Sequence, residues 1–307
     1  MTDEIGLWGV PLAILGGAIR VSTPFIFVSI GECLTERSGR INLGLEGTLV
    51  FGAMSGYAVA YHTGSPWLGT LAAAFSGLLF GLLHGWLCRL PRVNDIAIGI
   101  ALMIFGTGLA FLFGKPYVQP VAPDLPAIPL GFWSSLPQVQ AALNVNVLFL
   151  VGIVLAFATA WMLKNTRVGL TIRVTGDSAD AARALGIDVN RVRLWSTAAG
   201  GALAGVGGAY LSLYYPGSWN EGISSGQGLM AVALVIFARW NPVNCLYASL
   251  LFGGAGALGP ALQSVGITSG YYLFYAAPYV LTLGLLVATS SRTRAMPSAP
   301  GELSIVK

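Results

Sequence analysis

Charged residues are scarce in this chain, and their scarcity excludes a water-soluble globular protein. Asp, Glu, Lys and Arg make up 9% of the 307 residues, whereas 55% are hydrophobic and the mean hydropathy is +0.74. A soluble surface needs a much larger share of charged side chains than this. The composition therefore predicts an integral membrane protein whose chain crosses the bilayer several times.

Sequence motifs for covalent chemistry are also missing. No Gly-x-x-x-x-Gly-Lys-Ser/Thr phosphate loop occurs, and no Ser-His-Asp or Cys-His set stands in a polar segment. The cysteines Cys33, Cys88 and Cys245 are odd in number and lack ligand spacing, and His62 and His84 stand apart from other ligands. We expect no catalytic residue, no metal and no cofactor on this chain. If ATP drives its function, another subunit must bind the ATP and its magnesium ion.

Nine apolar segments are long enough, or nearly so, for a membrane helix of about 20 residues. The sequence therefore predicts an all-α polytopic protein with about nine spans, within a range of eight to ten. The seventh segment is short, and the second opens with a polar, glycine-rich turn, so either helix could be broken or re-entrant. The segments lie near 7–31, 41–61, 67–88, 94–114, 145–164, 192–214, 228–241, 243–263 and 270–290.

The positions of Lys and Arg predict the orientation, because these residues prefer short cytoplasmic loops. They occur in alternate loops, which places the N-terminus outside and the C-terminus inside for nine spans. Splitting the first segment at Ser22-Thr23-Pro24 would place the N-terminus inside. We expect a transmembrane domain over 1–291, with a cytoplasmic loop at 165–191, and a short disordered cytoplasmic tail at 292–307. The net charge of +4 reflects these topological signals and indicates no nucleic-acid partner.

Two further segments have expected places outside the membrane or at its surface. The proline-rich loop 115–144 is predicted to be external, and a rigid connector is favoured over a substrate gate. Tyr214, Tyr215 and Trp219 follow the sixth segment and fit an aromatic belt at the interface, with stacking on a planar ligand as the alternative.

Two stretches share a pattern that indicates an inverted repeat. One begins at 44–47 and continues to Pro66, and the other begins at 226–228 and continues to Pro242. The positions of Lys and Arg in the flanking loops predict that the first stretch runs from inside to outside and the second from outside to inside. Inverted repeats with glycine-interrupted helices are typical of transporters and point to the transport pathway.

Polar residues in apolar segments require partners, because a charge at the bilayer centre costs roughly 2.5–3.5 kcal/mol. Asn42 and Glu46, with Gln227 at the start of the second repeat unit, are candidates for the pathway. Alternatively, Glu46 lies near the membrane edge and caps a broken helix. We expect Arg20 to be structural, either paired with a carboxylate such as Glu46 or Glu32 or reaching to the interface. Small residues recur every four positions over 200–208, as Gly200, Ala204 and Gly208 and as Gly201 and Gly205, and they predict a helix that its neighbours approach closely.

The longest polar interruption lies between Lys164 and Arg193. Within it, Asp177 or Ser178 can cap a helix over Ala179–Leu185 that Gly186 ends. Ala181, Ala182 and Leu185 could form a small apolar face beside Arg183. A capped helix held between two spans favours docking to a soluble subunit over a plain solvated loop.

Four stretches also carry a resemblance to a known family: Thr23-Pro24, 35–47, 176–187 and 228–242. In these the chain resembles permease subunits of bacterial ATP-binding-cassette (ABC) importers of the branched-chain amino acid and simple-sugar group. It is most similar to the second permease of nucleoside importers that use a basic-membrane-protein-type lipoprotein receptor. The Asn-x-Gly-x-Glu-Gly stretch from Asn42 and the Gly-Asp to Leu-Gly-Ile loop from Gly176 are the specific parts.

The resemblance implies a type II importer fold, a bacterial plasma-membrane location and a set of partners. These are a second permease in a pseudo-symmetric heterodimer, cytoplasmic ABC ATPases that bind ATP and magnesium, an extracytoplasmic solute-binding lipoprotein, and membrane lipid. The implied solute is a nucleoside, with purines favoured. The loop would hold the coupling helix on an ATPase, with the residues Arg173, Gly176, Asp177, Ala181, Ala182, Arg183, Leu185 and Gly186.

One departure from the family pattern bears on the solute. Relatives often carry Asn where Met103 stands in the fourth segment, so we include Met103 among the pathway candidates. A simple sugar or related solute is the alternative cargo. A different mechanism, an ion-coupled secondary transporter, would need a carboxylate such as Glu46 to hold the ion and would leave the docking loop unexplained. An intramembrane enzyme has almost no support in the sequence.

Overall fold

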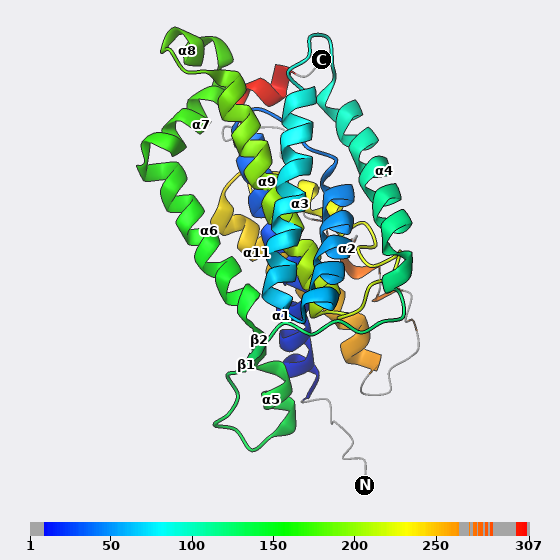
Figure 1. The fold of residues 1–307 in the computed structure, drawn as a ribbon. Helices are drawn as coiled ribbons and strands as arrows, with labels where there is room; N and C mark the ends of the chain where they lie inside the picture. Colours follow the sequence, from blue (N-terminus) through cyan, green and yellow to red (C-terminus); the bar gives the residue numbers. More distant parts are fainter. Residues whose placement is uncertain are drawn as a thin grey trace.

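The chain folds into a bundle of α-helices that mostly run along one common axis (Figure 1). The computed structural model describes residues 9–263, 270, 273–274, 276–278, 280–281, 283–284 and 299–305. A two-stranded antiparallel sheet lies at one end of the bundle, and the short helix α8 lies at the other end (Figure 1).

The long helices correspond closely to the expected segments. They are α1 (Gly9–Arg37), α2 (Leu45–Thr63), α3 (Pro66–Leu87), α4 (Asp95–Gly114), α6 (Val147–Asn165), α9 (Val189–Leu213) and α11 (Pro242–Gln263). The shorter elements are η1 (Lys115–Tyr117), β1 (Ala127–Pro129), α5 (Pro137–Ala142), β2 (Asn144–Asn146), α7 (Arg167–Asp177), α8 (Ala179–Ala184), α10 (Gln227–Phe237) and η2 (Gly301–Ile305). The expected segment 270–290 lies largely outside the described residues, so the count of nine stays a prediction.

Several helix starts carry the side-chain caps that fix where a helix begins. Asn94 Oδ1 accepts hydrogen bonds from Ile96 N and Ala97 N at the start of α4. Asn146, Thr166 and Asp188 cap α6, α7 and α9 in the same way. Each such cap is worth about 1 kcal/mol to a helix. Asp95 follows Asn94 in the first turn, as expected, and also forms an ion pair with Arg40.

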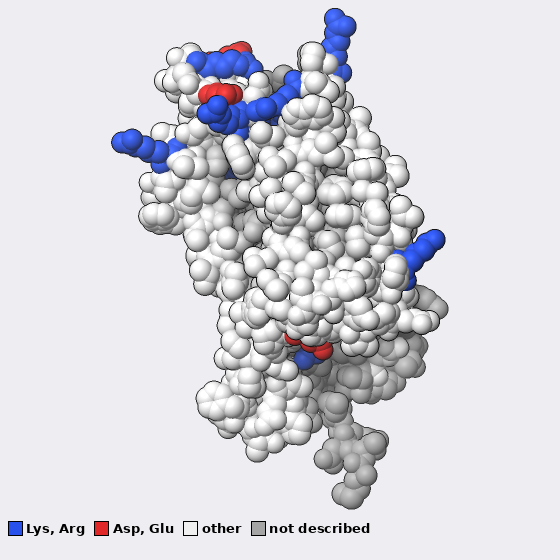
Figure 2. All heavy atoms as spheres, viewed as in Figure 1, with Lys and Arg blue, Asp and Glu red and all other residues white. Residues whose placement is uncertain are grey.

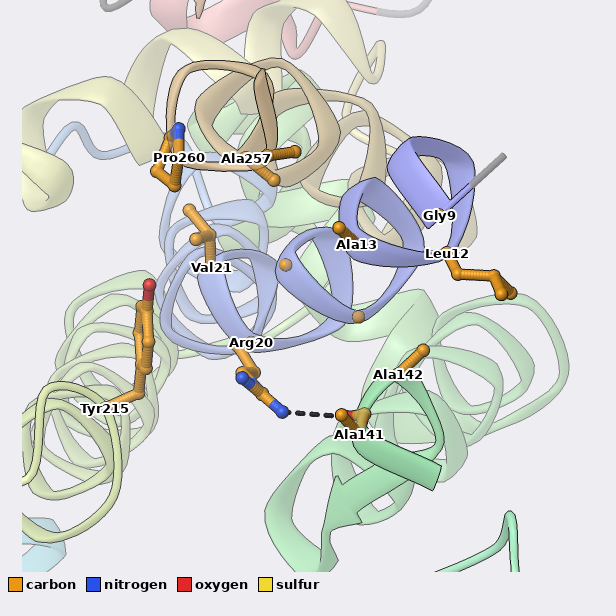
Figure 3. A pocket seen from close by; sticks show the side chains of 13 residues that line it. Gly9, Leu12, Ala13, Arg20, Val21, Ala141, Ala142, Tyr215, Ala257 and Pro260 are labelled. Atoms are coloured by element: carbon orange, nitrogen blue, oxygen red, sulfur yellow. Dashed lines mark hydrogen bonds between the residues drawn. The ribbon is translucent and has the colours of Figure 1, made fainter. Parts of the chain in front are cut away.

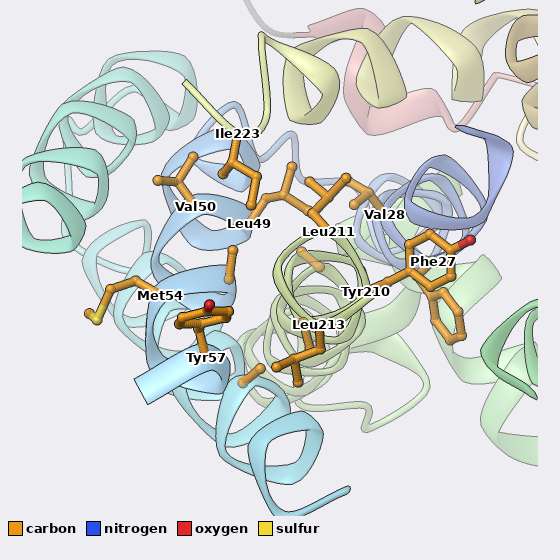
Figure 4. Close-up of a cluster of buried hydrophobic side chains, with 14 of the residues drawn as sticks. Phe27, Val28, Leu49, Val50, Met54, Tyr57, Tyr210, Leu211, Leu213 and Ile223 are labelled. Atoms are coloured by element: carbon orange, nitrogen blue, oxygen red, sulfur yellow. The ribbon is translucent and has the colours of Figure 1, made fainter. Parts of the chain in front are cut away.

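Helix α9 lies at the centre of the bundle and packs against α1, α2 and α3. Its glycines allow this, because a Cβ at Gly201 would collide with Gly77 of α3 and a Cβ at Gly208 with Leu49 of α2. The close approach expected from the glycine spacing is therefore present. Figure 4 shows the core beside it, where side chains from α1 (Phe27), α2 (Leu49, Tyr57) and α9 (Tyr210, Leu213) meet.

The outer helices have the character of a surface in contact with lipid. Five described helices are long and apolar enough to cross a membrane: α1, α3, α4 continued through η1, α6 and α11. Large apolar side chains are exposed on their outer faces, among them Leu71 of α3, Leu112 of α4 and Val154 of α6. α1 runs without interruption through Pro24, so the alternative of a split first segment is wrong.

The loop from α4 to α6 is held against the bundle. The Tyr57 hydroxyl donates to the Pro120 carbonyl at 2.7 Å and accepts from Ala122 N at 3.2 Å, and Leu125 N donates to Leu213 O at 2.8 Å. β1 then pairs with β2 in antiparallel register. These bonds fit the rigid-connector interpretation of the loop better than a mobile gate.

Trp219 does not belong to an interfacial belt, contrary to expectation. Its side chain is 1% exposed and fills the space beside Gly114 at the end of α4, where a Cβ would collide with the indole ring. The reason is that the chain folds back after α9 and carries Trp219 into the core. Tyr215 remains exposed.

Candidate functional site

The first candidate site is the carboxylate of Glu46, which holds the segment before α10. Glu46 lies in the first turn of α2 and is nearly buried. Its Oε1 accepts hydrogen bonds from Ser224 Oγ at 2.5 Å and Gly226 N at 3.1 Å, and its Oε2 accepts from Gly228 N at 2.6 Å. A carboxylate at a helix N-terminus is stabilised by the free N–H groups and by the helix dipole. Glu46 of α2 therefore caps α10, and its partner Gly228 lies 182 residues after it in the sequence.

Local backbone geometry explains why this contact can form. Ser225 and Gly226 have positive φ angles of 47° and 84°, which turn their backbone toward α2 just before α10 begins. A Cβ at Gly228 would lie 2.5 Å from Glu46 Cα, so a glycine is needed at this position. The two stretches that share the repeat pattern thus touch each other at their starting points. The inverted repeat itself stays a prediction.

A cavity of about 530 Å³ adjoins Glu46. Its walls come from α2, α4 and the segment that precedes α10, and its lining mixes apolar and polar groups. The lining residues are Glu46, Val50, Met103, Ile104, Thr107, Gly108, Phe111, Glu221, Gly222, Ser224, Ser225 and Gly226. A concave site of this size with a few polar groups suits a small polar molecule.

The structure brings together two of the four pathway candidates. Glu46 and Met103 line the cavity, whereas Asn42 and Gln227 do not. Asn42 is buried in the turn before α2, where its Oδ1 accepts from Gly44 N at 2.9 Å and its N–H donates to Glu32 Oε1 at 2.8 Å. Gln227 is the first residue of α10, and its Oε1 is buried without a hydrogen-bond partner among the described residues. A role in transport for all four stays a prediction.

Arg20 lies far from these groups and has a partner that the sequence did not indicate. Its Nη2 donates to the Ala141 carbonyl of α5 at 2.8 Å instead of pairing with Glu46 or Glu32. Figure 3 shows the guanidinium directed at Ala141 beside a second cavity of about 290 Å³, with Tyr215 at another edge. The predicted carboxylate partner is therefore wrong, because the loop after α4 brings a carbonyl oxygen within reach of the side chain.

Two buried carboxylates near the end of α1 were missed as structural anchors. Glu32 accepts from Asn42 N, as described, and Glu36 accepts a hydrogen bond from Trp240 Nε1. Arg37 Nε donates to the Trp240 carbonyl at 2.8 Å. The bonds of Glu36 and Arg37 fasten the end of α1 to the turn between α10 and α11, whereas the bond of Glu32 fastens it to the turn before α2. Their sequence signal was two carboxylates spaced i, i+4 at the end of an apolar helix, which places both on one face.

The predicted docking helix is present as α8. Ser178, not Asp177, is its cap, with Oγ accepting from Ala181 N at 3.2 Å. Gly186 ends the helix with a φ of +77°, and Ile187 N donates to Ala182 O at 3.0 Å. This pattern is the usual glycine stop at a helix C-terminus.

The apolar face of α8 differs from the prediction in one residue. Ala182 is fully buried against Val174, Ile187 and Val189, so it holds α8 on its own hairpin. Leu185 is 70% exposed, and Ala181, Arg183 and Gly186 are also exposed. The outward surface of α8 therefore centres on Leu185 and Arg183, whereas Ala182 belongs to its attachment.

The other residues of the predicted coupling set lie on α7. Gly176 is buried where α7 crosses the end of α1, and a Cβ there would collide with the Arg37 carbonyl. Arg173 is half-buried, and its Nε has no hydrogen-bond partner among the described residues. Asp177 is exposed. Arg173 and Gly176 thus face the helix bundle.

The C-terminal segment joins this region, which the sequence did not predict. Glu302 of η2 accepts from Ala179 N of α8 at 2.8 Å and from Arg193 Nη2 of α9 at 2.9 Å. Arg193 Nε in turn donates to the Ser38 carbonyl at 3.1 Å. Residues 299–305 are therefore ordered, and the prediction of a disordered tail is wrong for them. The rest of the expected tail lies outside the described residues.

Lys and Arg side chains gather at the end of the molecule that carries α8 (Figure 2). The long helices α6 and α9 lead to this end, where the basic segment that contains α7 and α8 joins them (Figure 1). Among the described residues, no group of three or more His, Cys, Asp or Glu side chains could hold a metal ion.

Comparison with known proteins gives consistent matches over almost the whole chain. The putative glucose ABC transporter permease protein TsgC13 of Haloferax volcanii is 32% identical over 94% of this chain and 88% of its own length. The nucleoside ABC transporter permease protein NupC of Lactococcus lactis is 30% identical over 94% and 95% of the two chains. The guanosine ABC transporter permease protein NupQ of Bacillus subtilis is 29% identical over 91% and 92%.

A family match agrees with these relatives. Residues 14–289 match the family described as branched-chain amino acid transport system / permease component. With five apolar helices of spanning length among the described residues, this identifies a multi-pass membrane protein. The chain belongs to the permease-component family of the branched-chain amino acid transport systems.

Proposed function

We propose that this chain is the permease subunit of an ATP-driven ABC importer that moves a nucleoside inward across the membrane. The observation that carries the proposal is a series of hydrogen bonds that begins at the exposed helix α8 and leads toward the cavity beside Glu46. Such a series can transmit the motion of a docked subunit to a transport pathway.

The route has three parts. Glu302 joins α8 to Arg193, and Arg193 binds the Ser38 carbonyl at the end of α1. The turn that follows is fixed by Asn42, which bonds Glu32 and Gly44. This turn leads directly into α2, whose first turn carries Glu46. A displacement of α8 would therefore reach the segment before α10 through a series of short contacts, partly buried at Glu302 and Arg193 and buried at Asn42.

The chain needs partners to do this work. We propose that a cytoplasmic ABC ATPase, with its ATP and magnesium, docks on α8, and that the α8 side faces the cytoplasm of a bacterial plasma membrane. A second permease completes the pathway, most simply as a heterodimer. Two permease proteins of Lactococcus lactis, NupC and NupB, match this chain at 30% and 22% identity, which supports a paired arrangement. An extracytoplasmic lipoprotein would deliver the solute.

Two relatives support a nucleoside as the solute, and a purine nucleoside in particular. They are the nucleoside and guanosine permease proteins of Lactococcus lactis and Bacillus subtilis. Phe111 and Met103 give the cavity apolar surface for a base, and Thr107 and Ser225 offer hydroxyl groups for polar edges. A simple sugar is the second candidate, which the glucose permease relative favours. Competition for uptake between guanosine and glucose separates the two.

An ion-coupled transporter working alone is a weaker explanation. Both oxygens of Glu46 already accept hydrogen bonds from Ser224, Gly226 and Gly228, so this carboxylate acts as a helix cap. A coupling ion would have to displace these donors.

The test is reconstitution in liposomes. Vesicles that hold this permease with its ATPase, second permease and receptor should accumulate radiolabelled guanosine when ATP is inside with the ATPase. Vesicles that hold this chain alone should not. Uphill accumulation of a solute by the chain alone, driven by an ion gradient, would overturn the proposal.

A further inference from the structure

A groove between α7 and α9 has the features of a ligand site that the proposed function does not use. Its volume is about 480 Å³, and its lining comes from α1, α6, α7 and α9. Figure 1 shows that α6 leans away from α9 toward the end that carries α8, and that α7 then leads the chain back toward α9. The size lies within the range of about 300–1,000 Å³ typical of small-molecule sites.

The walls of the groove are apolar and its rim is basic. Met162, Ile172 and Val192 form part of the wall, while Arg167 and Arg191 line it from opposite helices. The Arg167 guanidinium has no ion-pair partner among the described residues. Arg191 has only a long contact of 3.8 Å with Asp188, and both of these side chains are largely exposed. Two guanidinium groups at one apolar groove are therefore free to bind an anion.

The groove lies where the apolar part of the bundle meets water. α6 is apolar as far as Leu163, and Lys164 and Arg167 follow at its end. Trp195 lines the groove and is 58% exposed, which is typical of an aromatic residue at a membrane surface. An occupant must therefore have an apolar part at the depth of the hydrocarbon and a charged part at the depth of the headgroups.

We propose that this groove binds one anionic phospholipid, with the phosphate between Arg167 and Arg191 and an acyl chain along Met162 and Trp195. Charge complementarity selects the anionic headgroup, and basic pockets between membrane helices are known to hold such lipids. A polar peptide would leave the apolar wall uncovered, and free phosphate would leave it empty. The bound lipid would brace α7 against α9 and so stiffen the hairpin that carries α8.

The experiment measures lipid binding and does not depend on transport. The full-length chain, with any subunits that copurify, is exchanged into neutral detergent and given phosphatidylglycerol, phosphatidylcholine or inorganic phosphate. Native mass spectrometry then counts retained lipid, and a thermal-melting assay reports stabilisation. We expect retention and stabilisation with phosphatidylglycerol and neither with phosphatidylcholine or inorganic phosphate. Equal retention of the two lipids, or stabilisation by phosphate alone, would overturn the proposal.

Two variants locate the site. Arg167→Gln combined with Arg191→Gln should reduce the preference for phosphatidylglycerol about 30-fold, because one basic residue near an anionic surface contributes roughly fivefold. Arg183→Gln, on the exposed surface of α8 and outside the groove, should leave it unchanged. Ala199→Phe fills the groove without changing charge and should also reduce retention. An unchanged preference in the double variant or in Ala199→Phe would contradict the site.

Discussion

Glu302 accepts a hydrogen bond from Arg193 Nη2 at 2.9 Å although the two residues lie 109 positions apart in the sequence. The same carboxylate accepts from Ala179 N at the start of α8. Gly39 makes room for the contact, since a Cβ there would lie 2.9 Å from the Glu302 Cβ. The C-terminal segment therefore holds α8 against α9 and the end of α1. We call these contacts of Glu302 with Ala179 and Arg193 the clasp.

Removing the clasp should weaken coupling without preventing assembly. Glu302→Ala deletes two hydrogen bonds to a charged group, which together contribute about 1 kcal/mol once the partial exposure of the side chain is taken into account. We expect more ATP hydrolysed per solute imported, by about twofold, and faster proteolysis after residue 298. Asp180→Asn is the control, because the Asp180 side chain is 95% exposed and its ion pair with Arg183 lies at the surface. An unchanged ratio of ATP hydrolysed to solute imported in Glu302→Ala would show that the Glu302 contacts take no part in coupling.

The clasp should also depend on pH in a defined direction. Burial by itself raises the pKa of Glu302, but the hydrogen bonds from Ala179 N and Arg193 and the nearby positive charge outweigh it, so the pKa lies below its usual value of 4.5. A lowered pKa means that the contact stabilises the folded state above pH 4.5 and is lost as the pH falls through the lowered value.

Hydrogen exchange at the Ala179 amide should report this loss. Relative to the intrinsic exchange rate, we expect constant protection between pH 8 and pH 5 and a decline only below about 4.5. Glu302→Ala, which has no group to titrate there, should show low protection throughout. Loss of protection between pH 8 and pH 6 in the natural chain would contradict the assignment.

The surface of α8 should determine docking through Leu185. Its side chain is 70% exposed, and replacing it with Asp places a charge on the apolar surface offered to the ATPase. We expect Leu185→Asp to lower ATP-driven uptake at least tenfold, a loss of about 1.4 kcal/mol or more in the coupled step, while the permease still inserts. Co-purification of the ATPase and uptake in vesicles measure the effect.

A matched control lies at the other end of the molecule. Leu130 is also exposed and follows β1, far from α8 (Figure 1), so Leu130→Asp should leave docking intact. Ala182→Arg is not an equivalent test. Ala182 is buried, so the longer arginine side chain would unfold the hairpin and not only change the surface of α8. Normal uptake by Leu185→Asp would refute docking on α8.

Much of α8 was predictable because its signals are local. Ser178 and Gly186 determine where the helix begins and ends through contacts within a few residues, and these signals are visible in the sequence. The direction of Ala182 was not predictable, since three apolar residues on a two-turn helix do not reveal which side faces Val189. The same limit applies to Trp219, whose burial depends on Gly114, more than 100 residues earlier.

The candidate site was predictable in part for a related reason. A glutamate near the start of an apolar helix marks Glu46 as a residue that needs a partner. Its donors are Ser224, Gly226 and Gly228, and no local pattern pairs them with Glu46. Only the packing of α10 against α2 places the N-terminus of one helix at the carboxylate of the other. The cavity wall from α4 has the same origin, so Met103 was suggested by a resemblance and Thr107 was missed.

The contact between Glu46 and the start of α10 should be essential for transport. Glu46→Gln keeps the shape of the side chain, but its NH₂ group must face the backbone N–H of either Gly226 or Gly228. One buried donor then lacks an acceptor, which costs about 1–3 kcal/mol. We expect uptake to fall about tenfold or more, with normal insertion and ATPase binding.

A second variant approaches the same contact from the other side. Gly228→Ala places a Cβ 2.5 Å from Glu46 Cα and should separate the two elements, with a similar loss of uptake. Gly108→Ala is the control, because it lines the cavity and a Cβ there meets no atom within 4 Å. Full uptake by Glu46→Gln would leave the carboxylate with no role beyond that of a replaceable cap.

The orientation can be tested by labelling two exposed positions at opposite ends of the bundle. Val121, which is 83% exposed, lies on the loop after α4, and Asp180 lies on α8. The natural cysteines Cys33, Cys88 and Cys245 are all buried and should react slowly with a membrane-impermeant maleimide. Since Lys and Arg gather at the α8 end, that end should face the cytoplasm. Val121→Cys should therefore be labelled in intact cells and Asp180→Cys only after permeabilisation. The reverse pattern would place α8 outside, where no ATPase could reach it, and the coupling route would have no source of motion.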